Sequence, residues 1–268
     1  ERVSTLDAMA SPRTSYALLD RHGAQIDVVE RSVVFPASPP DATWRYARSN
    51  GVALHTTWQA ACDHAMWELI ERDRVLRAWY GETTPERLDS ELWEPPASSS
   101  YEWRAYEFPA GNGPRARSTE VVGVFGFPTD DTAPFVLGYA GRDDRGAALA
   151  AARREAMQLL AFLWGEPIAD EPPEPAPTAM YHLDAYQARG RHRIVREWLD
   201  EGHSRFRRGS RCEPVVHAIT GFVDLTPTWL AGRFHVVKAI ASDALPLVFG
   251  ACPASEHLPP MRAFHPIP

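Results

Sequence analysis

Residues 49–80 have the sequence SNGVALHTTWQAACDHAMWELIERDRVLRAWY, in which a turn precedes a long amphipathic segment. We predict a helix over roughly 57–80, because apolar side chains recur at helical spacing and share one stripe. The stripe consists of Trp58, Cys62, Ala65, Leu69, Leu76 and Tyr80. Thr56, with Gln59 three residues later, has the spacing of a capping box and favours a helix start here. This helix is expected to bury its apolar face in the core.

Three charged residues, Glu68, Glu71 and Arg72, lie at the margin of that stripe. Residues three or four positions apart are neighbours on a helix, so the two carboxylates can share a hard divalent cation such as Mg²⁺. An adjacent arginine can bind a phosphate group through two parallel hydrogen bonds. The pattern favours a metal–nucleotide site on a rigid helix, and the alternative is a surface helix held by ion pairs.

The turn before this helix contains Ser49, Asn50 and Gly51. Backbone N–H groups in such a turn, together with the serine hydroxyl, can bind an anion. The alternative is a simple turn whose glycine adopts a positive φ. The residues alone leave both interpretations open.

A second helix is predicted over roughly 144–164, capped by Asp143 or Asp144 and ended by Gly165 and Pro167. Its one face is formed by Ala148, Ala151, Ala152, Glu155, Gln158, Leu159 and Phe162. Because the neighbouring side chains are small, the Glu155 carboxylate has room for a ligand or a cation beside it. The alternative is a glutamate that flanks a helix–helix contact.

The remaining pattern predicts a mixed α/β (α+β) domain, because helices and strands are interspersed along the chain. Strands are expected at Ile26–Val34, Val121–Phe127, Phe135–Ala140, Val215–Val223 and His235–Ile240. A third helix is predicted over roughly 184–201, capped by Asp184 and weakened by Gly190. Loops are expected at 35–43 and 94–100, and the proline-rich segment 165–178 is expected to be an exposed loop.

The composition excludes several classes of protein. The net charge of −7 argues against a general attraction to nucleic acid or to anionic membranes. No apolar run is long enough for a transmembrane helix, and no signal peptide opens the chain. The cysteines Cys62, Cys212 and Cys252 are far apart, which favours a reduced, cytoplasmic protein.

The basic residues have an unusual distribution. Lys238 is the only lysine among the 28 basic residues, and no GxxxxGK[ST] motif occurs, which excludes Walker-type phosphate binding. The stretch 189–211 holds eight arginines with Trp198 and Phe206 between them. Such a stretch could bind an anionic partner such as RNA. The negative net charge favours the alternative, a solvated basic face that balances acidic surfaces elsewhere.

Several segments together resemble the YcaO-domain family, and they do so in that family's order. The stretch 49–80 resembles its central motif, and Gly138–Leu160, GYAGRDDRGAALAAARREAMQLL, is similar to its later nucleotide-site helix. Phe234–Phe249 matches a late strand and turn, and His265-Pro266-Ile267-Pro268 resembles the proline-rich end of azoline-forming members. Glu1-Arg2-Val3-Ser4 resembles the end of the family's first ExxER motif, so residues 1–268 are expected to form a partial YcaO-like domain.

The resemblance implies a β-sheet with packed helices and a nucleotide pocket between helices. It implies an ATP- and Mg²⁺-dependent cyclodehydratase that converts Cys, Ser or Thr of a ribosomally made precursor peptide to thiazoline or oxazoline. In that reaction the side chain attacks the preceding carbonyl, the resulting oxygen is phosphorylated, and phosphate leaves. The implied partners are the precursor peptide and a leader-peptide-binding protein, a homodimer stays open, and neither nucleic acid nor a membrane is expected.

The resemblance also assigns roles by position. Glu1, Glu68 and Glu71 are expected to hold Mg²⁺, and the terminal Pro268 carboxylate is expected to lie near the active site and order it. The expected nucleotide contacts are Ser49, Asn50, Glu68, Arg72, Glu155 and Gln158. Phosphoryl transfer depends mainly on positioning and charge neutralisation, which carboxylate-bound Mg²⁺ and arginine supply.

The sequence departs from the family pattern at several positions. Ala60 stands where an acidic residue is usual, Thr56 where an asparagine is usual, and Ala151 and Ala152 where an arginine is usual. Each lost charged contact is worth about 2–4 kcal/mol in a transition state, by analogy with one oxyanion donor. An alternative is therefore a catalytically degenerate scaffold that binds peptide or partner subunits in a biosynthetic complex. Thioamide formation is a third option, against which the proline-rich end argues.

Overall fold

The computed structural model describes residues 13–97, 100–109, 119–130, 132–205, 219–251 and 262–267. Its described strands form three sheets in which every pairing is antiparallel. The five-stranded sheet has the order β2 (Gln25–Glu30), β1 (Ser15–Leu19), β9 (Ile219–Asp224), β10 (His235–Ala241) and β4 (Val52–His55). The four-stranded sheet has the order β5 (Glu86–Arg87), β6 (Tyr101–Glu107), β7 (Glu120–Pro128) and β8 (Val136–Arg142). The third sheet pairs β11 (Val248–Gly250) with β3 (Trp44–Tyr46).

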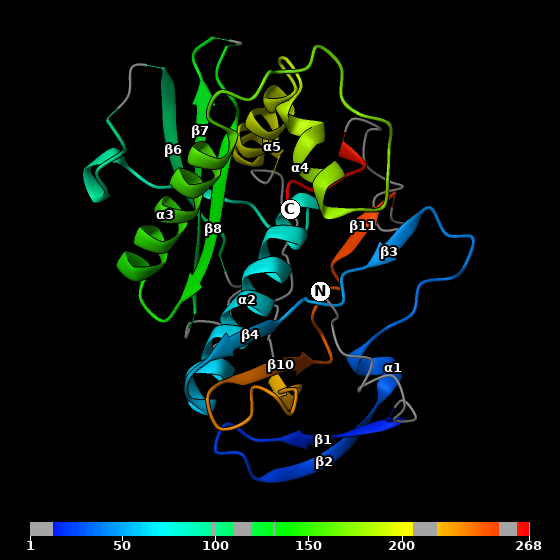
Figure 1. The fold of residues 1–268 in the computed structure, drawn as a ribbon. Helices are drawn as coiled ribbons and strands as arrows, with labels where there is room; N and C mark the ends of the chain where they lie inside the picture. The colour runs from blue at the N-terminus through cyan, green and yellow to red at the C-terminus, as the bar shows by residue number, and fades with distance from the viewer. Residues whose placement is uncertain are drawn as a thin grey trace.

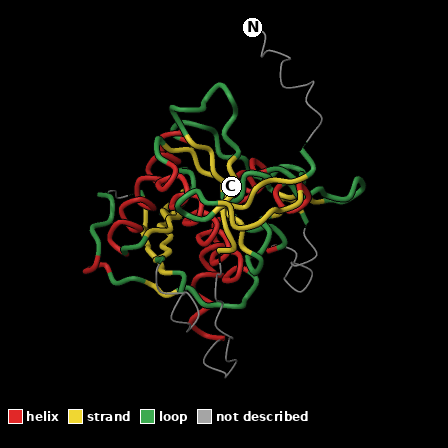
Figure 2. Tube along the Cα trace, turned by 90° about the horizontal axis from the view of Figure 1, so that it is seen from below, coloured by secondary structure: helices red, strands yellow, loops and turns green. Residues whose placement is uncertain are grey.

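The described helices lie between and beside these sheets, which confirms the mixed α/β prediction (Figures 1 and 2). They are α1 (Arg31–Val34), α2 (Trp58–Trp79), a 3₁₀ turn at Ser90–Leu92, α3 (Arg145–Leu163), α4 (Ala179–Gln187) and α5 (His192–Arg205). No helix among the described residues is long and apolar enough to cross a membrane.

Helix α2 runs through the middle of the molecule and connects the two large sheets (Figure 1). Its first half packs Cys62, Ala65 and Leu69 against Val237 of β10. Its second half packs against the aromatic core over the four-stranded sheet, where Trp79 meets the ring of Trp198 at 4.9 Å. Burial of this many large apolar side chains is the main contribution to the stability of the fold. The helix consequently presents Glu68 and Glu71 at a fixed place between the sheets.

Strand β8 is enclosed by α2 on one face and α3 on the other, and two glycines permit this approach. A Cβ on Gly138 would lie 2.3 Å from the backbone oxygen of Ala152 in α3. A Cβ on Gly141 would lie 2.7 Å from the backbone oxygen of Trp67 in α2. Neither distance is possible for a real side chain, so both glycines are required for the close packing that brings the two helices to the same strand.

The predicted boundaries of the first two helices are close to those of α2 and α3, with one correction to the residue that caps α2. Helix α3 begins after Asp144, whose side chain accepts a hydrogen bond from Ala147 N, as expected. Helix α2 is capped by Thr57 and not by Thr56, because the Thr57 side chain accepts a hydrogen bond from Ala60 N at 3.3 Å. The predicted capping box is therefore wrong, because the third residue after Thr57 is Ala60, whose side chain cannot accept a hydrogen bond in return.

Two predicted elements have different boundaries. The expected strand Ile26–Val34 stops at Glu30 and continues as α1, because its partner strand begins at Ser15, which pairs with Glu30. The predicted third helix is two helices, α4 and α5, separated at Gly190, which has a φ of +71° that a helix cannot accommodate. Thr178 caps α4, so Asp184 lies inside that helix and does not cap it.

Candidate functional site

The edge of strand β8 is where carboxylates from two helices meet the backbone. Among the described strands β8 is the last of its sheet, so the N–H groups on its outer edge face no described partner strand. Gly141 N donates to Glu71 Oε2 of α2 at 2.9 Å. Tyr139 N donates to Glu155 Oε2 of α3 at 3.1 Å. Two amides at this edge thereby fix one carboxylate from each helix. The carboxylates in turn satisfy backbone N–H groups that would otherwise be unpaired.

These carboxylates face a pocket of about 400 Å³ between α2, α3 and β8. Its wall includes five of the residues that the sequence singled out for cofactor or metal binding: Glu68, Glu71, Arg72, Glu155 and Gln158. Arg72 Nη1 forms an ion pair with Glu68 Oε1 at 2.7 Å, one helical turn apart. The structure thus brings together residues from 68 to 158, which no local pattern connects.

Three carboxyl groups in the pocket have raised pKa values, a condition that the binding of a cation would relieve. Burial, with the nearby charge of Glu155, raises the pKa of Glu71 to about 8. Burial also raises the pKa of Glu68, although the Arg72 guanidinium opposes the shift. The pKa of Glu155 is raised by burial, against the effect of the hydrogen bond from Tyr139 N. Three carboxylates in one pocket are therefore costly to ionise together without a positive ligand.

The donor set suits magnesium, which prefers oxygen ligands and retains several of its own waters. In the described part of the chain, however, no three His, Cys, Asp or Glu side chains are arranged closely enough to hold a metal ion. The carboxylates present thus fit a hard cation in their chemistry.

Other predicted site residues lie elsewhere. Ser49 is exposed, and Asn50 lines a separate cavity of about 140 Å³ next to Lys238. Burial raises the pKa of Glu68, and the Gly51 backbone at the end of this turn opposes that shift. Glu1 and Pro268 lie outside the described residues.

The described end of the chain reaches the wall of the pocket. Tyr139, which lines the pocket, donates its hydroxyl to the backbone oxygen of Pro266 at 3.3 Å. His182 of α4 and His265 hold this end through backbone partners: His182 Nδ1 lies 2.9 Å from His265 O, and His265 Nε2 lies 2.9 Å from Val248 O. The described C-terminal segment is therefore tied to Tyr139, a residue that also lines the pocket.

An aromatic ladder beside the pocket was missed at the level of sequence. His55 stacks on His64 at 5.5 Å between ring centroids, and His64 meets the edge of Trp67 at 5.0 Å. The Arg142 guanidinium lies over the Trp67 ring at 5.1 Å. His64 and Arg142 both line the pocket. The one available signal was the proximity of His55 and His64 in sequence to Glu68, Glu71 and Arg72.

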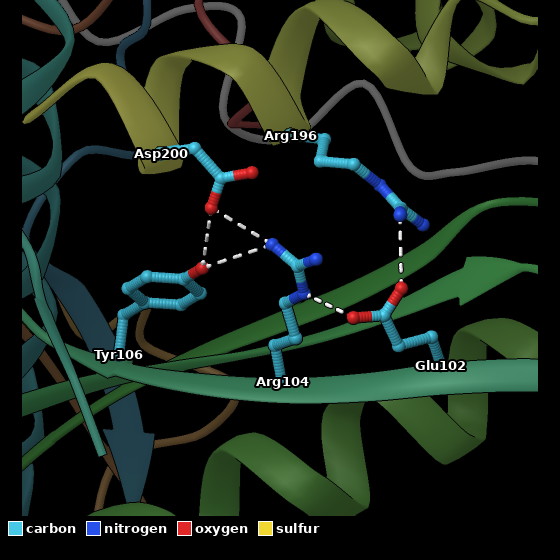
Figure 3. A network of polar contacts seen from close by, with 5 residues as sticks. All are labelled: Glu102, Arg104, Tyr106, Arg196 and Asp200. Atoms are coloured by element: carbon cyan, nitrogen blue, oxygen red, sulfur yellow. Dashed lines mark hydrogen bonds and ion pairs between the residues drawn. The ribbon is translucent and has the colours of Figure 1, made fainter. Parts of the chain in front are cut away.

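Two arginines of the described part of the arginine-rich stretch form ion pairs: Arg189 with Asp170 at 2.8 Å, and Arg196 within the network of Figure 3. Arg196 binds Glu102 at 2.8 Å, and Arg104 of β6 bridges Glu102 and Asp200 at 2.6 and 2.8 Å. Trp198 is buried and donates to Ala78 O at 3.0 Å, so it belongs to the core. This arrangement agrees with the interpretation of a basic face balanced by acidic neighbours. Phe206 and residues 207–211 lie outside the described residues.

Comparisons with known proteins place these features in context. The family described as YcaO cyclodehydratase, ATP- and Mg²⁺-binding, matches residues 22–243. A search of curated proteins returns no match.

Several solved structures share the fold at low sequence identity. The YcaO protein from Methanopyrus kandleri bound with AMPPCP and Mg²⁺ has a TM-score of 0.54 at 15% identity, over 88% of this chain and 65% of that one. The E. coli microcin synthetase McbBCD complex with pro-MccB17 bound has a TM-score of 0.58 at 10% identity, over 95% and 72%. A heterocyclase in complex with substrate and cofactor has a TM-score of 0.56 at 15% identity, over 87% of this chain. The match spans only 32% of the length of that heterocyclase.

Proposed function

This chain belongs to the YcaO family, and on that basis we propose that it is an ATP- and Mg²⁺-dependent peptide cyclodehydratase, or a component of one. The substrate class would be a ribosomally made precursor peptide whose Cys, Ser or Thr becomes a thiazoline or oxazoline. The observation that carries the proposal is the convergence of Glu71 and Glu155, from two helices, on adjacent outward amides of β8 in one pocket with Arg72.

Each residue of the pocket has a role that its chemistry allows. Glu68 and Glu71 would hold Mg²⁺, and Arg72 would contact phosphate oxygens of the nucleotide. Bound Mg²⁺–ATP supplies the phosphoryl group that turns the amide oxygen of the peptide into a leaving group. The side chains of the pocket bind and orient the reactants and neutralise charge, which is most of what phosphoryl transfer asks of a protein.

The structures of relatives support a multi-component assembly. A related complex is a synthetase of several subunits with its peptide bound, and another relative is a heterocyclase with substrate and cofactor. We propose that this chain likewise receives a precursor peptide from a leader-peptide-binding partner. A homodimer is the alternative assembly, and size-exclusion chromatography with light scattering distinguishes the two.

The direct test is titration calorimetry of the purified chain with ATP at fixed Mg²⁺, with and without the partner protein. We expect binding by the wild type, a large loss in Glu71→Gln, and no change in Glu91→Gln, an exposed glutamate away from the pocket. With precursor peptide added, mass spectrometry should detect loss of the elements of water for each ring, with release of phosphate.

The competing function is a scaffold of the same fold that binds peptide or subunits without catalysis. It is favoured by Ala60 at a position where the family has an acidic residue, and by the lack of a compact metal-ligand group among the described residues. Failure of the wild type to bind Mg²⁺–ATP even with the partner present would favour the scaffold. Retained peptide binding in the same sample would establish it.

A further inference from the structure

Helix α3, on the outside of the four-stranded sheet, is apolar on its outer face as well as on its inner one (Figure 1). Its inner face is a row of buried alanines that pack against β7 and β8. A surface helix ordinarily carries polar side chains on the side that faces water. The outer face of α3 instead carries, at helical spacing, Ala150, Met157, Ala161 and Trp164. Met157 is 39% exposed and Trp164 is 76% exposed, and apolar surface gathered in this way is typical of an interaction site.

A groove of about 480 Å³ lies on this outer face. Every residue that lines it belongs to α3: Ala150, Arg153, Arg154, Met157, Gln158 and Ala161. From its first to its last residue the groove is about 16 Å long at the rise of an α-helix, which is the length of about five residues of extended peptide. Because a single helix supplies all of these walls, an occupant has to provide the opposite side. We call this feature the α3 groove.

The charge of the α3 groove favours one kind of occupant. Its two charged side chains, Arg153 and Arg154, are both positive, and neither forms an ion pair with any residue that the structure describes. A twofold dimer formed through this face would bring the same arginines of both copies together, which is unfavourable. A segment that carries carboxylates next to apolar side chains would match both the charge and the apolar surface.

The α3 groove is continuous with the candidate nucleotide pocket. Arg154 and Gln158 line both of them. Glu155, which accepts the hydrogen bond from Tyr139 N inside the pocket, lies between these two residues in sequence. A chain lying in the groove therefore passes within one helical turn of the pocket. The chain that has to reach that pocket in a cyclodehydratase is the peptide being modified.

We propose that the α3 groove is a docking site for the precursor peptide, which binds there through a short segment of acidic and apolar residues. The carboxylates of that segment pair with Arg153 and Arg154, and its apolar side chains cover Met157 and the adjacent alanines. The inference rests on the proposed function for the identity of the occupant. The groove lies outside the pocket that would hold Mg²⁺–ATP, so docking contributes to peptide affinity and not to phosphoryl transfer.

The first test measures peptide binding without nucleotide, by fluorescence anisotropy. The probe is a short fluorescein-labelled peptide that alternates glutamate and leucine, and the comparison peptides alternate lysine with leucine and glutamate with serine. We expect the wild type to bind the glutamate–leucine probe about tenfold more tightly than either comparison peptide, because only that probe supplies both the charge and the apolar contact. Equal binding of the three peptides, or no binding of the probe, overturns the inference.

The decisive variant is Met157→Glu, which removes apolar surface from the groove and places a carboxylate opposite those of the peptide. We expect it to weaken probe binding by about tenfold or more. The matched control is Met180→Glu, the same change at a methionine that is 55% exposed on α4 and does not line the groove. That control should bind like the wild type. Equal binding by both variants overturns the inference, and circular dichroism verifies that both are folded.

The contribution of charge is tested at Arg153, because Arg153 lines the groove and not the nucleotide pocket. We expect Arg153→Gln to weaken probe binding by about threefold, the effect of one exposed ion pair, and to reduce its dependence on salt. An unchanged salt dependence contradicts the pairing of peptide carboxylates with this arginine.

The final test uses the modification reaction with precursor peptide, partner protein and Mg²⁺–ATP. We expect Met157→Glu to raise the KM for the peptide, with kcat and the affinity for Mg²⁺–ATP unchanged, because the lost contact holds the peptide equally before and during the reaction. Met180→Glu should leave all three unchanged. A lower kcat at unchanged KM overturns the docking role.

These outcomes separate the inference from the proposed function. Absence of Mg²⁺–ATP binding by the wild type, with probe binding that Met157→Glu loses, refutes the function and supports a peptide site on α3. Ring formation with the same peptide KM in the wild type and Met157→Glu supports the function and overturns the inference. A dimer that Met157→Glu dissociates in light scattering assigns this face to a second copy of the chain and also overturns it.

Discussion

Replacing Gly138 with alanine tests whether the close approach of α3 to β8 builds the pocket. A Cβ at this position would lie 2.3 Å from Ala152 O and 2.5 Å from Ala156 N, whereas ordinary contact begins at 3.4 Å. Helix α3 therefore has to retreat by about 1 Å, because both obstructing atoms are backbone atoms that cannot rotate away. The retreat also separates Glu155 from the Tyr139 amide, which it meets at 3.1 Å.

The two effects can be added as a rough magnitude. Overpacking against a rigid neighbour costs ~1–3 kcal/mol, and loss of one hydrogen bond costs about 1 kcal/mol. We expect Gly138→Ala to lower the free energy of unfolding by ~3 kcal/mol, which is a large part of the stability of a typical domain. The assay is urea denaturation followed by circular dichroism and tryptophan fluorescence, with Mg²⁺–ATP affinity measured on the folded protein.

The matched control for this experiment is Gly146→Ala in the same helix. A Cβ there meets only Asp144 Oδ1, at 3.1 Å, which is the oxygen that caps α3 and can give by a few tenths of an ångström. The better helix propensity of alanine offsets a weakened cap, so this variant should stay within ~1 kcal/mol of the wild type. If Gly138→Ala unfolds at the same urea concentration as Gly146→Ala, the argument that β8 requires glycine for the approach of α3 is wrong.

Three further predictions follow from the described contacts. In urea denaturation, Thr57→Ala should cost about 1 kcal/mol, and Thr56→Ala should cost much less, because only Thr57 caps α2. Glu71→Gln should raise the thermal midpoint of the metal-free protein more at pH 8 than at pH 5. The folded protein keeps the Glu71 proton up to a pKa of about 8, whereas the unfolded chain releases it at lower pH, so the wild type loses stability across that interval. An equal gain at both pH values contradicts this. Burial lowers the pKa of His182 to about 4, so between pH 6.5 and 4 the unfolded chain binds a proton that the folded chain excludes. Acidification over this range should therefore lower the free energy of unfolding by up to ~3 kcal/mol. His182→Gln should show a flatter pH dependence of that free energy.

The stability prediction for His182 depends on hydrogen bonds that require neutral rings. His182 Nε2 accepts from Gly250 N at 2.8 Å, so its proton lies on Nδ1, facing the His265 oxygen. His265 Nε2 faces the Val248 oxygen, and its Nδ1 accepts from Ile267 N at 3.3 Å. Protonation of either ring would place a ring N–H opposite the backbone N–H that the ring now accepts from. Burial also lowers the pKa of His265. Acid should therefore loosen the C-terminal segment first.

Local sequence signals located the helices of the site well, because the residues that end and cap a helix act within one turn of it. Helix α3 starts after Asp144 as expected, and the central helix was displaced by only one residue at its start. The signals failed where a neighbour decides the outcome. Strand β4, Val52–His55, was not among the predicted strands, because its pairing with β10 comes from residues about 180 positions away.

The strand β6, Tyr101–Glu107, was missed for a related reason. Its alternation of aromatic and charged residues is short, and its charges are accommodated by two helices that lie far away in sequence. Arg104 and Glu102 pair with Asp200 and Arg196 of α5, and Glu107 pairs with Arg145 of α3. Nothing near residues 101–107 in sequence predicts those partners. The arginine-rich stretch was likewise ambiguous, because the carboxylates that neutralise it lie on a different element.

The position of β8 at the edge of its sheet explains why carboxylates from two helices meet in one pocket and why each is bound to a backbone amide. The sequence could identify Glu71 and Glu155 as candidates. The sheet order that leaves the amides of Tyr139 and Gly141 available to these carboxylates is a property of the whole fold. Amides two residues apart on one strand are separated by roughly 6.6 Å, so the carboxylates bound to them are held apart. Among the described residues no three metal-ligating side chains form a compact group, even though these donors share one pocket. Each carboxylate accepts its amide through Oε2, so its other oxygen can face a cation while the hydrogen bond to the edge of β8 stays in place.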